Sequence, residues 1–273
     1  MNSNIYESLY LLDSGMFGKV YVTKHKYTNE LFALKQDTSR ENLVLHESRI
    51  LQLLSSHPNI PKFKWYGLVN NLQSMVIELL DISLKNRVTK NKEENSLLFN
   101  KYKNDMLNVI DFVHSKGIIH RDIKPDNFMI KNNRIYLIDF GLATYYNNNK
   151  ERTKIHKPLK SGLEIIGSYK YCSINMHKGF SPSRRDDIES LMYVFLFIIM
   201  GKIPWNNICE SNKVEKNKLY ITSKERILKN DTSGTSHSNE SKIFYLLKII
   251  TKIDYESKPQ YSLFRQILNK HDN

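Results

Sequence analysis

The residues with the clearest chemical meaning lie in two short strings near the middle of the chain. H-R-D-I-K-P-D-N runs from His120 to Asn127, and D-F-G runs from Asp139 to Gly141. Together they supply a carboxylate that could activate a hydroxyl, a cation beside it and two metal ligands, namely Asp122, Lys124, Asn127 and Asp139. Transfer of a phosphoryl group from a nucleotide needs this set, so the sequence predicts ATP- and Mg²⁺-dependent phosphotransfer.

Two short apolar runs are expected to position these residues. N-F-M-I ends just before Lys131, and I-Y-L-I ends just before Asp139. They read as a pair of strands around a turn at 131–134. The carboxylates would then lie on loops at strand ends, where a rigid sheet can hold them.

The rest of the chain divides into a strand-rich part and a helix-rich part. Alternating patterns predict strands within 5–36 and over 62–69 and 73–79, and a three- and four-residue periodicity predicts a helix over 41–55. After Asp81 the pattern becomes mostly helical, with one apolar stripe along 97–115. The expected order is a small sheet with one helix, followed by a larger helical lobe.

The segment L-D-S-G-M-F-G-K-V, Leu12 to Val20, resembles the glycine-rich loop that covers nucleotide phosphates in protein kinases. Lys35 ends the strand F-A-L-K and could grip phosphates, with Glu47 on the next helix as its partner. The alternative is a simple hairpin turn, a surface lysine and a solvated glutamate. One departure is Asp13, which replaces the usual first glycine and could repel phosphates if its carboxylate points inward.

A narrower resemblance comes from five segments spread along the chain, which are similar to the casein kinase I family of serine/threonine protein kinases. They are V-I-E-L-L-D-I-S-L at 76–84, H-R-D-I-K-P-D-N-F-M-I at 120–130, Y-C-S-I-N at 171–175, S-R-R-D-D-I-E-S-L at 183–191 and I-P-W at 203–205. S-I-N stands where most protein kinases have A-P-E. The likeness covers essentially the whole chain and ends near F-R-Q-I-L at 264–268.

This resemblance implies an α+β bilobal kinase fold in a single catalytic domain, 1–273. The small β-rich N-lobe with one main helix would span about 1–79, the hinge 78–82 and the larger, mostly helical C-lobe 83–273, with ATP between the lobes. Asp187 would brace the catalytic loop. The implied ATP contacts are Leu12, Asp13, Ser14, Gly15, Met16, Phe17, Gly18, Lys19, Val20, Ala33, Lys35, Glu47, Ile77, Glu78, Leu80 and Met129.

The resemblance also implies acidic or already phosphorylated protein substrates. Ser168 occupies the place of a threonine that contacts Asp122 and Lys124 in such kinases. The residues expected to bind substrate or its anionic groups are Arg121, Ser168, Lys170, Arg184 and Arg185. Between Thr144 and Lys170 basic residues outnumber acidic ones, although a solvated lysine-rich loop would look the same.

Composition and apolar patterning bear on the partners, membrane insertion and compartment of the protein. The net charge of +13 favours acidic partners, but no motif for specific nucleic-acid binding accompanies it. The apolar run Leu191–Met200 is shorter than the about 20 residues that span a bilayer, so a buried core helix is expected. Without a signal-peptide pattern, Cys172 and Cys209 are expected to be reduced thiols, in a cytoplasmic or nuclear monomer.

Two expectations concern activity. Asp13 and the short chain leave a catalytically weak pseudokinase scaffold as the alternative to an active kinase, although Lys35, Glu47, Asp122, Asn127 and Asp139 are all retained. Lys35→Met and Asp139→Ala are expected to impair nucleotide handling while leaving thermal unfolding nearly unchanged. The polar stretch 230–241 also predicts a flexible loop. Serines three residues apart in this loop suggest that it is autophosphorylated in a relay, and the alternative is that their spacing arises by chance.

Overall fold

The computed structural model describes residues 5–15, 18–38, 43–147, 155–229 and 238–270. The chain forms two compact units. The first unit contains the residues up to Ser83 together with Phe128–Ala143, and the second contains Leu84–Asn127 and the residues from Thr144 onward. The strand-rich and helix-rich parts expected from the sequence are therefore both present, and each is described separately below.

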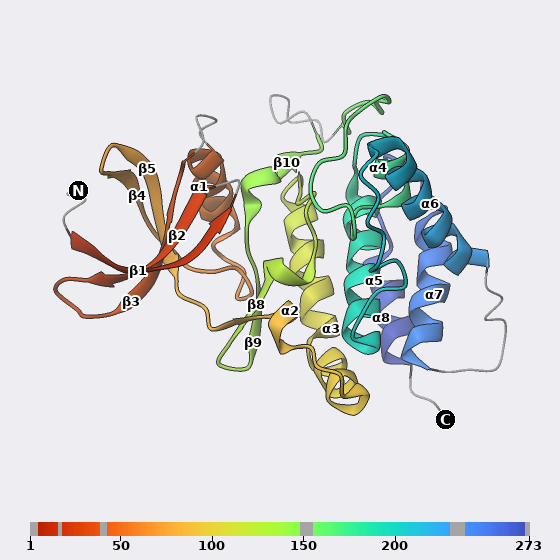
Figure 1. Cartoon of the computed structure of the whole chain (residues 1–273), viewed down its shortest axis with the longest axis horizontal. Coiled ribbons are helices and arrows are strands. Elements are labelled where there is room, and N and C mark those ends of the chain that lie inside the picture. The colour runs from red at the N-terminus through yellow and green to blue at the C-terminus, as the bar shows by residue number, and fades with distance from the viewer. Residues whose placement is uncertain (1–4, 16–17, 39–42, 148–154, 230–237, 271–273) are drawn as a thin grey trace. The chain divides into compact units, whose positions relative to one another are not determined.

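The first unit is built on a five-stranded antiparallel sheet with the strand order β1-β2-β3-β5-β4 (Figure 1). Helix α1 (Leu43–Leu54) contacts β4 and β5. The strands and the helix predicted for this part of the chain are confirmed. The strands are β1 (Tyr6–Gly15), β2 (Gly18–His25), β3 (Leu31–Gln36), β4 (Phe63–Val69) and β5 (Leu72–Glu78).

Alternation along β3 divides its side chains between two environments. Phe32 and Leu34 pack with Trp65 and Val76 in a buried apolar cluster. Because successive side chains of a strand point to opposite faces, Ala33 and Lys35 lie on the other face of the sheet. The core thus anchors the strand that presents Lys35.

A smaller antiparallel sheet also belongs to the first unit, with the order β6-β8-β9. Its strands are β6 (Ile82–Ser83), β8 (Phe128–Lys131) and β9 (Arg134–Leu137). The turn between β8 and β9 uses Asn132 and Asn133 at φ 49° and 59°, a backbone that asparagine tolerates well. The strand pair predicted around 131–134 is confirmed.

Hydrogen bonds explain why this small sheet groups with the first unit. The Asn59 side chain donates to the Ile135 carbonyl over 2.7 Å, and the Asp81 N–H donates to the Ile130 carbonyl over 3.1 Å. The sequence predicts a helical lobe over 83–273, which includes 128–143, whereas Phe128–Ala143 groups with the first unit. Contacts with residues far away in the sequence, which periodicity does not reveal, place it with the strands.

The second unit is mostly helical (Figure 1). Helix α5 is buried along most of its length and contacts α3 and α7, so the core helix predicted over 191–200 is confirmed. It begins earlier, at a capping box between Ser183 and Asp186. None of the helices in the described ranges is long and apolar enough to cross a membrane. The helices are α2 (Leu84–Arg87), α3 (Lys92–Ser115), α4 (Ile174–His177), α5 (Arg184–Met200), α6 (Lys213–Lys229), α7 (Asn239–Ile250) and α8 (Tyr261–Asn269), and the strands β7 (Ile118–Ile119) and β10 (Thr144–Tyr145) pair with each other.

The polar stretch 230–241 differs in part from the predicted flexible loop. Ser238 is the N-cap of α7, and its hydroxyl accepts the Ser241 N–H over 3.2 Å. The loop prediction is therefore wrong for 238–241, because serine is a favourable helix N-cap. Residues 230–237, including Ser233 and Ser236, lie outside the described residues.

Candidate active site

Lys35 is the centre of a charged cluster within the first unit. Its ammonium group lies 2.7 Å from Glu47 Oε2 on α1 and 2.7 Å from Asp139 Oδ1. Burial alone would lower the pKa of Lys35, but the charges of the two carboxylates outweigh it and hold this pKa above its ordinary value. Lys35 is therefore a fixed cation, and its predicted pairing with Glu47 is present.

Glu47 also ties α1 to the D-F-G segment. Its Oε1 accepts the Phe140 N–H over 3.1 Å, while Phe140 itself is buried at the start of the 3₁₀ turn η3 (Phe140–Leu142). Asp139 precedes this turn in a left-handed conformation, φ 64°, and its carboxylate remains partly exposed. A non-glycine residue held in this backbone region is a common feature of functional sites.

Several residues that the sequence predicts to contact ATP lie in the same unit. Val20 pairs with Lys35 and Ala33 pairs with Ile77 across neighbouring strands, so these side chains share the sheet face of Lys35. The Glu78 carboxylate lies 3.2 Å from Lys131 Nζ, and the Glu78 N–H donates to the Lys62 carbonyl. In the same unit, Leu80 is buried and Met129 lies on β8.

The glycine-rich segment forms the ends of the β1–β2 hairpin. A Cβ atom at Gly18, where φ is 131°, would lie 2.1 Å from the Gln36 carbonyl oxygen, so only glycine fits there. Asp13 is exposed, and its Oδ1 accepts the Ser14 N–H over 2.8 Å. Leu12, Gly15 and Lys19 are exposed as well, whereas Met16 and Phe17 lie outside the described residues.

Asp122 is the centre of a second polar cluster, within the second unit. Its Oδ2 lies 2.6 Å from Lys124 Nζ, and the Asn127 amide donates to the same oxygen over 3.2 Å. Its Oδ1 accepts the Ser168 N–H over 3.0 Å. Ser168 therefore contacts Asp122 through its main chain. The carboxylate is almost completely buried, so these donors fix its orientation.

Gly167 makes this contact possible. Its φ is 85°, and a Cβ atom there would lie 2.5 Å from the Arg121 carbonyl oxygen and 3.0 Å from Asp122 Oδ1. The 167–168 backbone can therefore approach the catalytic loop only because residue 167 has no side chain.

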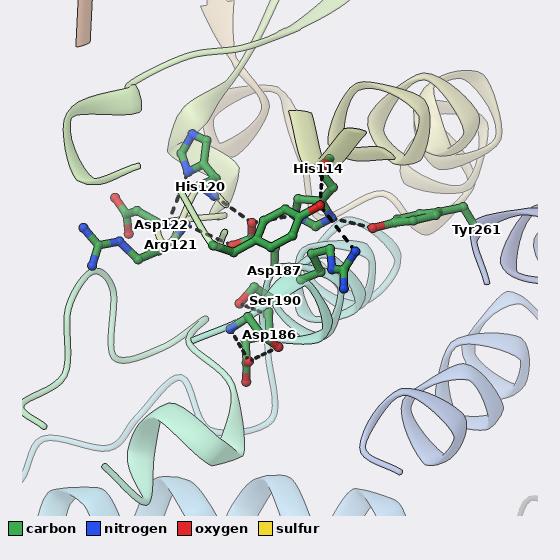
Figure 2. A network of polar contacts seen from close by, with 11 residues as sticks. His114, His120, Arg121, Asp122, Asp186, Asp187, Ser190 and Tyr261 are labelled. Atoms are coloured by element: carbon green, nitrogen blue, oxygen red, sulfur yellow. Dashed lines mark hydrogen bonds and ion pairs between the residues drawn. The ribbon is translucent and has the colours of Figure 1, made fainter. Parts of the chain in front are cut away.

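Asp187 on α5 holds the backbone that precedes Asp122 (Figure 2). It accepts the His120 N–H over 2.7 Å and the Arg121 N–H over 2.9 Å. Arg121 itself is left-handed, with φ 69°. Burial would raise the pKa of Asp187, but the hydrogen bonds that it accepts from the His114 side chain and the His120 N–H help to hold this pKa below its ordinary value. The hydrogen bonds from the His120 and Arg121 N–H groups thus support the bracing role predicted for Asp187.

The Lys35 cluster and the Asp122 cluster contain the residue types that protein kinases use for phosphoryl transfer. A comparison with family models points to the same family. The model of the protein kinase domain matches residues 6–272. The chain belongs to the protein kinase family. Enzymes of this family generally use ATP with magnesium. The β-sheet N-terminal region and helical C-terminal region of this kinase agree with the bilobal fold expected from its sequence.

The residues of this kinase suit magnesium bound together with nucleotide phosphates. Mg²⁺ prefers oxygen ligands and is usually held by one or two carboxylates plus phosphates. Asp139 offers a partly exposed carboxylate. Asn127 uses its amide N–H₂ on Asp122, so its amide oxygen is the atom that could bind a metal. When bound, Mg²⁺ neutralises phosphate charge, and the ammonium group of Lys35 would neutralise part of the remaining phosphate charge.

The segment after Ser168 is anchored by hydrogen bonds that involve residues of S-I-N, S-R-R-D-D-I-E-S-L and I-P-W. Ser173 of S-I-N donates to Asp186 Oδ1 over 2.5 Å, and the Ile174 N–H donates to Glu189 Oε1 over 2.7 Å. Trp205 of I-P-W donates to the Lys170 carbonyl over 2.7 Å. Residues of three motifs that are separate in the sequence therefore form hydrogen bonds within or to the 168–174 segment.

A buried lysine that the sequence did not single out supports the same segment. Lys224 of α6 is 1 % exposed, and its ammonium group donates to the Cys172 carbonyl over 2.5 Å and to His177 Nε2 over 3.1 Å. It also lies 4.8 Å and 5.2 Å from the ring centres of Tyr193 and Trp205. Nothing in the sequence distinguishes it from the many other lysines, because these partners come from three separate segments, 172–177, α5 and the turn at Trp205.

The buried ammonium group should make stability depend on pH in a recognisable way. Burial lowers the pKa of Lys224 from 10.5 to about 8. Between these values the unfolded chain binds a proton that the folded chain does not, so stability rises with pH. The full difference corresponds to about 3 kcal/mol. Urea unfolding from pH 7.5 to 10 should therefore show wild type gaining stability relative to Lys224→Met. Parallel curves for the two proteins would contradict this assignment.

Arg184 and Arg185, two of the predicted anion-binding residues, have extensive protein contacts. Arg184 donates to the Glu256 carbonyl over 2.5 Å and lies 4.4 Å from the centre of the Tyr146 ring. Arg185 donates to the Ile253 carbonyl over 2.5 Å. These contacts give both arginines a structural role in the second unit, and their part in binding substrate stays a prediction.

Proposed function

We propose that this protein kinase is an active serine/threonine kinase of the casein kinase I type, which transfers the ATP γ-phosphoryl group to acidic or pre-phosphorylated proteins. The observation that carries the proposal is the oriented Asp122 carboxylate. Lys124, Asn127 and the Ser168 N–H all donate to it. A carboxylate fixed in this way is suited to accept the proton of a substrate hydroxyl.

The charge on Lys124 suits a second task in the same step. Its ammonium group touches Asp122 and is partly exposed, so it could also stabilise negative charge on the group being transferred. K-P-D-N after the catalytic aspartate is the pattern of serine/threonine kinases, and S-I-N with its anchoring contacts supports the casein kinase I type. Lys35, held by Glu47, would bind the α- and β-phosphates of ATP.

A direct assay tests the proposal and separates it from a pseudokinase scaffold. The purified chain is incubated with casein, Mg²⁺ and ATP labelled at the γ-phosphate, and Asp122→Asn serves as the inactive control. Transfer to serine or threonine, identified by phosphoamino-acid analysis, would support it. An absence of transfer by the wild type, with magnesium-dependent nucleotide binding retained, would favour the scaffold instead.

A pocket within the second unit, whose few charged lining residues are mostly basic, supports the preference for anionic substrates. It has a volume of about 170 Å³, and its lining includes the cations Arg121, Lys157 and Lys160 and one carboxylate, Glu164. Arg121 directly precedes Asp122, so an anion bound in this pocket would lie near the catalytic loop. Guanidinium and ammonium groups are the usual protein donors to phosphate.

The double variant Lys157→Ala/Lys160→Ala should therefore weaken recognition of a primed substrate. We compare two peptides that differ only in a phosphoserine three residues before the target serine. Each exposed charge contributes about 0.2–1 kcal/mol, so the loss of two should lower kcat/KM for the primed peptide about 2- to 30-fold. The unprimed peptide should be affected less. Lys92→Ala, at the exposed start of α3, is the matched control, and an equal loss for both peptides would argue against the pocket.

A further inference from the structure

Tyr261, at the start of α8, makes a contact that links the last helix to the catalytic loop. Its hydroxyl lies 2.5 Å from His114 Nδ1, on the last turn of α3. The other ring nitrogen, Nε2, lies 2.8 Å from Asp187 Oδ2. Tyr261, His114 and Asp187 are all 3 % exposed or less. Figure 2 shows the three side chains in a continuous series.

The chemistry of the three groups sets the direction of each hydrogen bond. The Asp187 carboxylate only accepts, so His114 Nε2 carries the proton and donates to it. In a neutral imidazole the other nitrogen, Nδ1, is then an acceptor. The Tyr261 hydroxyl is the group beside it that can donate. Every polar atom in the series is satisfied in this arrangement, and removing the hydroxyl would leave the Nδ1 lone pair buried without its donor.

The series ends at the residues that position the catalytic aspartate. Asp187 uses its two oxygens on the His120 and Arg121 N–H groups. The Asp122 N–H in turn lies 3.3 Å from His120 Nδ1. A shift of the His114 ring would therefore reach the Asp122 backbone through Asp187. The Tyr146 hydroxyl holds His114 from a further direction by donating to its carbonyl over 2.9 Å.

We propose that Tyr261 is a positioning residue for catalysis, which fixes the tautomer and orientation of His114 and, through Asp187, the backbone of the catalytic loop. Tyr261 is buried, so it would act through its contact with His114. The proposal makes α8 part of the structure that sets the geometry at Asp122, although Tyr261 lies 147 residues from His114 in the sequence. The expected effect of Tyr261 on catalysis rests on the proposed kinase activity. Its expected effect on His114 and on the backbone at His120 and Arg121 does not.

The test is Tyr261→Phe in the full chain, which removes one oxygen atom and keeps the ring. Leaving a buried acceptor without its donor typically corresponds to an about 5- to 160-fold change in an equilibrium, and we expect kcat with casein to fall by a factor within that range while KM for ATP stays unchanged. Two further measurements do not need activity. Nitrogen NMR of the labelled histidines should show His114 protonated at Nε2 in the wild type and a changed Nδ1 signal in the variant. Amide exchange at His120 and Arg121 should become faster.

Tyr102→Phe is the matched control, because Tyr102 is a buried tyrosine of α3 outside this series. It should retain wild-type kcat, His114 signals and amide exchange. Wild-type kcat in Tyr261→Phe, or a wild-type His114 protonated at Nδ1 alone, would overturn the proposal. If the wild type transfers no phosphate at all, the proposed function fails. The NMR and exchange results then decide the positioning role, since unchanged exchange in Tyr261→Phe would also overturn it.

Discussion

Asp122→Asn should reduce phosphoryl transfer about 10²- to 10⁴-fold, the usual effect of losing a general base. An amide has nearly the same shape as a carboxylate but cannot take the proton of a substrate hydroxyl. The buried carboxylate also accepts from Lys124 and from the Ser168 N–H, and an amide can offer an oxygen to only one of them. The rate with casein and saturating ATP measures the effect.

The control for this change lies in the same loop. Asp126 is partly exposed and pairs with Lys85 at the surface, so Asp126→Asn repeats the chemical substitution outside the Asp122 cluster. We expect it to keep the wild-type rate within about twofold, because exposed ion pairs contribute little. Thermal unfolding of both variants checks that the fold is retained. Equal rates for Asp122→Asn and the wild type would show that another group accepts the proton.

The sequence predicted the parts of the molecule that depend on short-range patterns. Alternation in F-A-L-K indicated the strand that presents Lys35, and periodicity over 41–55 indicated the helix that carries Glu47. Each signal is local, because side-chain spacing follows directly from strand or helix geometry. The ion pair between them followed from the motif, and its 2.7 Å distance agrees.

Contacts between distant segments could not be predicted in the same way. Arg184 and Arg185 suggested an anion site, but each also donates a hydrogen bond to a backbone carbonyl about 70 positions later. Lys224 and Tyr261 carried no local signal, since a buried lysine and a surface lysine look alike in a sequence. Their partners, such as Cys172 for Lys224 and His114 for Tyr261, lie on segments that only the folded chain brings together.

Lys35→Met should remove activity and, contrary to the expectation from the sequence, also destabilise the fold. The ammonium group lies between Glu47, which is 2 % exposed, and Asp139, which is partly exposed. Loss of one partner from a buried ion pair typically costs about 3–5 kcal/mol. Asp139 can be hydrated, so most of the cost comes from Glu47. Activity should fall about 10²- to 10³-fold, as for the loss of other electrostatic groups.

The pH dependence of this loss identifies Glu47 as its source. Burial raises the pKa of Glu47, and Lys35 opposes that effect, so the variant should hold a proton on Glu47 more tightly than the unfolded chain does. Folding then binds a proton, and the variant loses stability as the pH rises above the ordinary pKa of a glutamate and through the raised pKa of Glu47. Urea unfolding at several pH values measures this, and a loss independent of pH would point elsewhere.

A second substitution separates the two roles of Lys35. In Lys35→Met/Glu47→Gln no charge is buried at position 47, and the amide oxygen can still accept the Phe140 N–H that Glu47 accepts. The double variant should recover most of the lost unfolding free energy and its pH dependence should disappear. Its activity should stay low, because neither change restores a cation for the ATP phosphates. Recovery of activity together with stability would mean that Lys35 acts only by neutralising Glu47.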